Sequence, residues 1–340
     1  MVAERKIVVS GMRATGRMHL GNYFGAVKNW VDLQEQYDCY YFVADWHALT
    51  TDYVDPSQVA QNSLEVVADA MAAGLDPERS VIFLQSLVPA HAELYLLFSM
   101  LTPLGWLERV PTYKDQMRQL ENKDLSTHGF LGYPVLQAAD ILIYRGDLVP
   151  VGEDQASHLE LSRELARRFN SYYGPTLPEP KALFTPTAKV PGVDGRKMSK
   201  SYGNTIDIAD SPDEIRRKCK GMFTDPTRIR RDDVGHPETC NLFQFHRLVS
   251  DDETQEQVAR ECRLAQIGCV DDKAVIADRL IAFLEPMRRR REQLMSDPGE
   301  LLAILRRGSE RAAERAEQTM VSVREAMGLS YDRPPQGTGE

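Results

Sequence analysis

Short apolar runs alternate with amphipathic stretches through the first hundred residues, and this alternation constrains the fold more than any other feature. Residues 6–10 (KIVVS), 40–44 (YYFVA) and 80–85 (SVIFLQ) lack polar alternation, as expected of strands covered on both faces. Between them, residues 56–75 have the spacing of an amphipathic helix that opens with Asp-Pro. This order predicts a parallel α/β sheet, whose ligands bind at the carboxyl ends of the strands.

The second half of the chain has a different pattern. From residue 211 onward, polar and apolar residues follow helical spacing in four successive stretches, which predicts a mostly helical second domain. A segment rich in proline and glycine, residues 174–195, precedes this change. The length of 340 residues and the 42% hydrophobic content suffice for two domains.

Charge and cysteine content restrict the class of protein. The 41 basic and 50 acidic residues give a net charge of −9, which argues against general nucleic-acid coating. Basic runs at residues 216–220, 228–231 and 288–291 are either a local footprint for a polyanion or solvated helix faces. The sequence has no signal-peptide core and no apolar stretch of ~20 residues, so we expect a cytoplasmic protein. Five sparse cysteines predict reduced thiols.

Two separated motifs indicate a nucleotide site. TGRMHLGN (residues 15–22) follows the first strand and opens a helix, where backbone N–H groups favour an anion and Gly21 permits close approach. It is neither G-x-G-x-x-G nor a P-loop. KMSKS (residues 197–201) carries Lys197 and Lys200, which could close over a triphosphate and stabilise a leaving pyrophosphate.

Together these motifs resemble the HIGH and KMSKS signatures of class I aminoacyl-tRNA synthetases. The stretches GNYFGAV, ADWHALT, YPVLQAADIL, VPVGEDQ and KMSKSYGN, in this order, resemble the tryptophanyl family within that class. The resemblance covers residues 6–328 and implies an α/β fold: a Rossmann-like catalytic domain at 1–205 and a helical anticodon-binding domain at 206–305. It also implies a helix at 306–329 that packs back on the catalytic domain, and we expect a disordered tail at 330–340.

The resemblance implies the substrates and the groups that bind them. The family activates L-tryptophan with ATP and Mg²⁺ to an adenylate, then transfers it to tRNA(Trp), and it forms homodimers. No covalent enzyme intermediate is implied, so positioning and electrostatics carry the reaction. By this resemblance the catalytic residues are His19, Asn22, Lys197 and Lys200. The residues implied in ATP binding are Arg13, Thr15, Gly21, Gly152, Asp154, Met198 and Ser199.

The tryptophan pocket is expected around the YPVLQAAD stretch. Tyr133, Gln137 and Asp140 follow i, i+4, i+7 spacing and would share one helical face. Asp140 is the expected acceptor of the indole N–H, and Tyr133, Gln137 and Gln155 would bind the ammonium and nearby polar groups. By analogy, a largely apolar cavity is completed by Val9, Gly11, His47, Val149 and Val151.

Some positions depart from the family pattern and keep other functions open. Ala14 stands where many relatives have proline, and Gln137 where many bacterial relatives have methionine. A Tyr-x-x-x-Gln-x-x-Asp helix also resembles tyrosyl enzymes, so tyrosine activation is the first alternative. The others are a small-molecule nucleotidylyltransferase and a paralogue that binds tryptophan or RNA without charging tRNA.

A cysteine cluster is the last feature. Cys240, Cys262 and Cys269 resemble three of the four cysteines that bind a [4Fe–4S] cluster in one subgroup of the family, and Asp272 occupies the fourth position. A carboxylate oxygen suits a thiophilic cluster poorly. The four residues could hold a labile cluster or zinc, or be a relic with three buried thiols. Cys39 and Cys219 fit no ligand spacing.

Overall fold

The computed structural model describes residues 5–110, 124–152, 156–184 and 190–331. Its catalytic part is built on a five-stranded parallel sheet of order β3-β2-β1-β4-β5. The strands are β1 (Ile7–Arg13), β2 (Asp38–Ala44), β3 (Ser80–Leu84), β4 (Leu148–Val151) and β5 (Lys181–Phe184). The strand order reverses at β1, and in sheets of this kind ligands bind beyond the carboxyl ends of the strands at such a reversal. The predicted Rossmann-like α/β class is confirmed.

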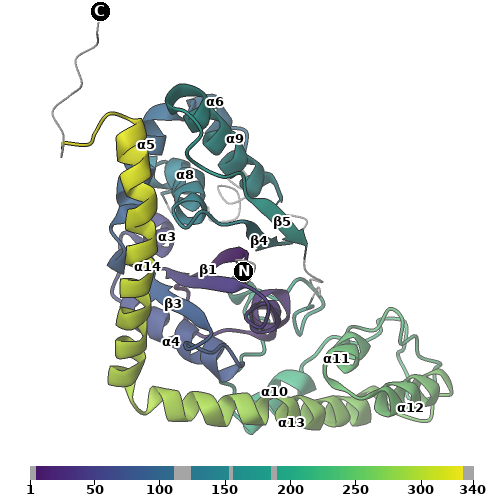
Figure 1. Ribbon diagram of the computed structural model, residues 1–340. Coiled ribbons are helices and arrows are strands. Elements are labelled where there is room, and N and C mark those ends of the chain that lie inside the picture. Colours follow the sequence, from purple (N-terminus) through teal and green to yellow (C-terminus); the bar gives the residue numbers. More distant parts are fainter. Residues whose placement is uncertain (1–4, 111–123, 153–155, 185–189, 332–340) are drawn as a thin grey trace, which may run out of the picture.

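Helices cover both faces of this sheet and predominate in the later part of the described chain (Figure 1). In the catalytic part they are α1 (Leu20–Asn22), α2 (Lys28–Leu33), α3 (Asp45–Asp52), α4 (Val59–Ala72), α5 (Ala90–Leu101), α6 (Leu104–Leu107), α8 (His128–Leu142) and α9 (Ala156–Tyr173). The later helices are α10 (Pro212–Lys220), α11 (Asn241–Val249), α12 (Asp252–Arg263), α13 (Cys269–Met295) and α14 (Pro298–Ala326). A π-helical turn spans Tyr23–Val27, and two 3₁₀ turns span Gln85–Leu87 and Lys200–Tyr202.

Alternation along the strands separates two buried layers. Val8 packs with Tyr41 on the face covered by α2 and α4, whereas Val9 packs with Phe42 on the face covered by α5 and α8. Successive residues of a strand point to opposite faces, so an unbroken apolar run fills both layers. The apolar strands predicted from the sequence are therefore required by the architecture.

Helix α14 lies against β3, the edge strand of the sheet (Figure 1). A Cβ atom at Gly308 would lie 1.8 Å from the backbone oxygen of Ile82, so the helix backbone touches the strand directly. The Ser309 hydroxyl accepts a hydrogen bond from the Leu84 N–H at 3.3 Å. The final helix thus covers an edge whose N–H and C=O groups would otherwise be unpaired.

Helices α10 to α13 form an arm that extends from the catalytic part (Figure 1). Helix α13 begins in the arm, beside α11, and its later turns pack on α4. Its 27 residues span about 40 Å at the rise of an α-helix. One uninterrupted helix therefore connects the outer arm to the catalytic sheet.

The C-terminal part of the chain departs from the predicted domain bounds. The helix expected at 306–329 begins earlier, at Pro298, so the 305/306 boundary falls inside α14. The division into domains stays a prediction. Most of the expected disordered tail, residues 332–340, lies outside the described residues. Within the described ranges, none of the helices has the length and apolar character needed to cross a membrane.

Candidate active site

The TGRMHLGN segment forms a tight turn between β1 and α1. Gly16 has φ +86°, the left-handed region that favours glycine, and a Cβ there would lie 2.9 Å from Asn62 Oδ1. His19 caps α1: its Nδ1 accepts the Asn22 N–H at 3.3 Å, and Asn22 Oδ1 accepts the His19 N–H at 3.2 Å. A Cβ at Gly21 would lie 2.8 Å from His19 Nδ1. The glycine therefore leaves room for the imidazole.

The capping role requires neutral His19. Only an unprotonated Nδ1 can accept a hydrogen bond from Asn22. Burial and, secondarily, the positive charge of Lys200 lower the pKa of His19 to about 4. The imidazole is therefore neutral at pH 7.

The KMSKS loop is held against this turn. Lys200 Nζ donates to the Thr15 carbonyl oxygen at 2.7 Å, and the Met198 Cβ lies 3.6 Å from where a Gly21 Cβ would be. Lys200 is exposed as a residue, but its ammonium is partly desolvated against the turn; this lowers its pKa, although the carboxylates of Asp207 and Asp69 oppose that change. The two sequence motifs predicted to share a nucleotide are thus in contact across 185 positions of chain.

Asn204 fixes the shape of the loop from inside. Its Oδ1 accepts the Ser199 N–H at 2.8 Å, and its Nδ2 donates to the Lys197 carbonyl oxygen at 3.1 Å and to Asp194 Oδ1 at 2.7 Å. Met198 is buried, whereas the side chains of Lys197 and Lys200 are exposed. The buried groups hold the loop, while the two lysine residues stay on its exposed side.

Asp140 lies at the centre of a buried polar network. Its Oδ2 bonds with His47 Nε2 at 2.8 Å, and its Oδ1 bonds with His91 Nδ1 at 2.6 Å and accepts from Gln85 Nε2 at 2.7 Å. His91 Nε2 in turn lies 2.6 Å from the Tyr144 hydroxyl. Burial disfavours the charged form of Asp140, but the hydrogen bonds from His47 and His91 outweigh it and lower its pKa to about 2. The network holds a carboxylate without solvent exposure.

The other residues expected to bind tryptophan or ATP differ in their exposure and contacts. The Tyr133 ring meets the His47 ring edge-on at 6.5 Å, and Gln137, one turn further along α8, is partly exposed. Gly11 is exposed. A Cβ atom added to Gly11 would lie only 2.4 Å from Cζ of the Phe42 ring. Arg13 donates from Nη2 to Thr51 Oγ1 at 2.6 Å.

The hydrophobic residues of that set lie in the core. Val9 is fully buried against α8, and Val149 and Val151 of β4 pack with Ile141 and Leu159. Gly152, after β4, is partly exposed. Asp154 and Gln155 lie outside the described residues.

The residues suggested as cluster ligands lie near one another: burial raises the pKa of Cys262, and Cys240, Cys269 and Asp272 are close enough for their charges to raise it further. All five cysteines of the chain, which lie in the described ranges, are free thiols. The Arg228 guanidinium donates to Cys262 Sγ at 3.7 Å, and Asp272 Oδ1 bonds with His246 Nε2 at 2.9 Å. Burial raises the pKa of Cys240 and of Cys262. In the part of the chain that the structure describes, no three His, Cys, Asp or Glu residues are grouped to hold a metal. The structure therefore gives no support to an iron–sulfur cluster at these residues, and the ligand set stays a prediction.

Sequence patterns missed several residues of the site. Gln85, His91 and Asn204 were not predicted, although each hydrogen-bonds to a predicted residue or its loop. Gln85 and His91 follow an apolar strand in the sequence. Their position after the carboxyl end of that strand could have marked them as candidate ligand-site residues. Asp69 and Arg291, which meet beside the nucleotide turn, are 222 residues apart and gave no local signal.

The fold and this pair of contacting motifs define a class I aminoacyl-tRNA synthetase. A family model described as "tRNA synthetases class I (W and Y)" matches residues 2–285. Tryptophan–tRNA ligases of Thermotoga maritima and Aquifex aeolicus are 49% and 44% identical to the chain; each alignment covers 95% of the chain and 99% of the relative. The chain belongs to the tryptophanyl-tRNA synthetase family, and the predicted resemblance is confirmed.

Solved structures agree with this assignment. Tryptophanyl-tRNA synthetase from Campylobacter jejuni, complexed with ADP and tryptophan, matches with a TM-score of 0.88 and 36% identity, over 95% of this chain and 100% of that one. A tyrosyl-tRNA synthetase from Archaeoglobus fulgidus matches less well, with a TM-score of 0.64 and 25% identity over 85% and 91% of the two chains. Similarity to the tryptophanyl structure therefore exceeds similarity to the tyrosyl alternative.

Proposed function

We propose that this site activates L-tryptophan with ATP and Mg²⁺ and then transfers the amino acid to tRNA(Trp), as a tryptophan–tRNA ligase. The tryptophan carboxylate would attack the α-phosphorus of ATP, forming tryptophanyl-adenylate and releasing pyrophosphate. A tRNA ribose hydroxyl would then attack the adenylate carbonyl and release AMP. The observation that carries this proposal is the contact between Lys200 and the Thr15 carbonyl, since it brings two phosphate-binding motifs to one site.

The residues at the nucleotide turn have complementary parts in this reaction. His19, Gly21 and Asn22 shape a turn whose backbone can approach the phosphates closely. Lys197 and Lys200, exposed on the opposite loop, would neutralise charge that develops on the leaving pyrophosphate. Catalysis of this kind needs no nucleophile from the protein.

Tryptophan selection is assigned to Asp140. Among the described residues, Oδ1 has two partners and Oδ2 has His47, so Oδ2 is the oxygen that we propose for the indole N–H. A site with a buried carboxylate in this role would reject amino acids that lack a matching donor by as much as ~10⁴-fold. Val9, Gly11, Tyr133, Gln137, Val149, Val151 and Gln155 remain predictions for the surrounding pocket.

Amino-acid-dependent ATP–pyrophosphate exchange tests this function. Exchange should require tryptophan and remain at background with tyrosine or phenylalanine. Exchange with tyrosine alone would establish the tyrosyl alternative. A folded protein that binds tryptophan but gives no exchange would instead be a paralogue that does not charge tRNA.

The arm is proposed to bind the anticodon of tRNA. In the loop between α10 and α11, Arg230 and Arg231 are exposed, whereas Arg228 is buried and bonded to the carbonyl oxygens of Arg231 and Ile267. In the other candidate run, Arg291 is buried in ion pairs, Arg288 and Arg289 pair with Glu285, and Arg289 and Arg290 are exposed. Arg231 also pairs with Asp271, at 3.2 Å. We favour the first run for phosphate contacts because it lies on a loop of the arm, whereas the second lies where α13 meets α4.

A homodimer is proposed from the apolar surface of α5 and α6. Leu96 and Met100 lie on one face of α5, and Leu104 begins α6; their exposed fractions are 56%, 68% and 65%. Grouped exposed hydrophobic side chains of this size mark interaction sites, and a second copy of the chain is the proposed partner. Met100→Glu should convert the dimer to a monomer in light scattering, whereas Val54→Glu, at another exposed position, should leave a dimer. A monomeric wild-type protein would contradict the proposal.

The [4Fe–4S] cluster receives no support from the arrangement around Cys262 and Asp272, and no reaction step is assigned to it. A visible absorption spectrum of protein purified without oxygen tests this point. We expect no iron–sulfur charge-transfer band, and a band that disappears in Cys262→Ser would reinstate the cluster.

A further inference from the structure

Four charged residues from three parts of the chain meet beneath the nucleotide turn. Asp69 of α4 accepts the Met18 N–H on Oδ2 at 2.6 Å, and Arg291 of α13 donates from Nε to Asp69 Oδ1 at 2.5 Å. Arg291 also donates to Glu65, whose Oε2 lies 3.7 Å from Arg17 Nε. We call Arg17, Glu65, Asp69 and Arg291 the charge network.

Burial makes this network unusual. Asp69 is fully buried and Arg291 is 8% exposed. Charged side chains are seldom buried to this extent unless they are paired, because desolvation costs several kcal/mol for each ion. Burial raises the pKa of Asp69 to about 7, and the guanidinium of Arg291 at 2.5 Å favours its carboxylate form. With both acids ionised, the two carboxylates are matched by two guanidinium groups.

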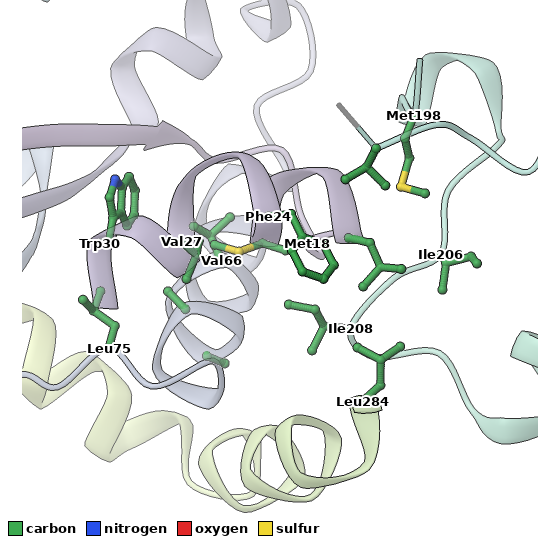
Figure 2. Close-up of a cluster of buried hydrophobic side chains, with 14 of the residues drawn as sticks. Met18, Phe24, Val27, Trp30, Val66, Leu75, Met198, Ile206, Ile208 and Leu284 are labelled. Carbon is green, nitrogen blue, oxygen red and sulfur yellow. The ribbon is translucent and has the colours of Figure 1, made fainter. Parts of the chain in front are cut away.

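The network joins the arm to the ATP site through one backbone group. Met18 precedes His19, and its carbonyl oxygen accepts the Ile208 N–H at 2.9 Å. Figure 2 shows the Met18 side chain in the same buried cluster as Val66 of α4 and Leu284 of α13. Asp69 also lies close enough to Lys200 for its charge to affect the pKa of that lysine. A displacement of Asp69 or Arg291 would therefore change the position of the Met18 backbone and the electrostatic environment of Lys200.

We infer that Asp69 and Arg291 are positioning residues for ATP. Asp69 fixes the backbone immediately before His19, and Arg291 holds Asp69 while cancelling a negative charge that would otherwise face the triphosphate. This inference rests on the proposed function only in taking the turn as the ATP site. It gives the last turns of α13 a part in ATP binding that neither motif reveals.

The test is a double-mutant cycle read by direct binding. ATP and tryptophan affinities are measured separately by calorimetry for the wild type, Arg291→Gln, Asp69→Asn and the double variant. Arg291→Gln should weaken ATP binding about tenfold and leave tryptophan affinity within about twofold, which also shows that the fold is intact. In the double variant the unpaired carboxylate is gone, so ATP affinity should recover severalfold relative to Arg291→Gln.

A matched control and a conservative variant complete the test. Arg324→Gln breaks a two-bond pair between α14 and Glu93 of α5, at 2.7 Å for each bond, and should leave ATP affinity unchanged. Arg291→Lys should retain most of the affinity lost in Arg291→Gln. Parallel losses for both ligands, or additive losses in the double variant, would overturn the inference. ATP binding without exchange in the wild type would defeat the proposed function alone, and no ATP binding would defeat both.

Discussion

At the scale of single residues, His19 shows how the turn depends on a protonation state. Its folded pKa of about 4 lies below the ~6.5 of an unfolded histidine, so the unfolded chain binds a proton that the folded chain excludes. The free energy of unfolding should therefore fall as pH drops from about 6.5 to 4, by about 3 kcal/mol from this residue. Denaturant titrations of the wild type and His19→Asn should diverge across this window. Parallel curves would contradict the assignment, because asparagine can cap a helix without titrating.

Lys200 is the second residue whose function can be isolated. Its ammonium lies 2.7 Å from the Thr15 carbonyl oxygen and would act on the leaving pyrophosphate. Lys200→Ala should lower the exchange rate constant by about 10²-fold and change tryptophan affinity by less than about twofold. Exchange kinetics and equilibrium binding check this, with Lys6→Ala, at an exposed position before β1, as the control. Equal losses in rate and affinity would mean that Lys200 only supports the fold.

Some residues of the candidate site could be identified from the sequence, whereas others could be identified only from the folded structure. His19 and Lys200 belong to local motifs, so their chemistry could be recognised without a structure. Asp140 was predicted from helical spacing, but its three buried partners come from α3, α5 and the turn after β3 and meet only in the folded chain. The contact between Asp69 and Arg291 could not be predicted from sequence either, because it depends on how α13 crosses α4.

At the scale of elements, the contact between α14 and β3 depends on Gly308. A methyl group there would overlap the Ile82 carbonyl oxygen, and a backbone atom in a sheet cannot move aside easily. Gly308→Ala should lower the free energy of unfolding by about 3 kcal/mol despite the better helix propensity of alanine. Gly129→Ala in α8 is the control, since nothing lies within 4 Å of its Cβ position. Equal unfolding midpoints for the two variants would show that α14 does not press on the strand.

Element prediction succeeded where patterns were long or fully apolar. The expected strands correspond to β1, β2 and β3, and the helix expected at 56–75 contains α4. β4 and β5 were missed because each has only four residues, β4 includes Pro150, and β5 lies within the segment rich in proline and glycine. β4 is a strand because it pairs with β1 and β5, and β5 because it pairs with β4; both pairings are tertiary effects.

At the scale of the whole molecule, the anticodon contact proposed for the arm predicts that tRNA charging can be impaired without loss of amino-acid activation. Arg230→Ala combined with Arg231→Ala should reduce tRNA charging about tenfold or more at moderate salt and leave tryptophan-dependent exchange unchanged. Charging and exchange assays on the same preparation provide the measurement. Arg290→Ala, from the competing basic run, should have little effect on charging. The reverse pattern would move the anticodon contact to α13.

The position of α14 in the sequence also determines how long the edge of β3 stays uncovered during protein synthesis. β3 ends at Leu84 and α14 begins at Pro298, so more than 200 residues are synthesised between the strand and the helix that covers its edge. At a synthesis rate of ~5–20 residues per second, the nascent protein carries an uncovered strand edge for roughly 10–40 s. Such an edge can pair with another chain. Mutations that slow the docking of α14 are therefore expected to reduce the soluble yield of the protein before they reduce its activity.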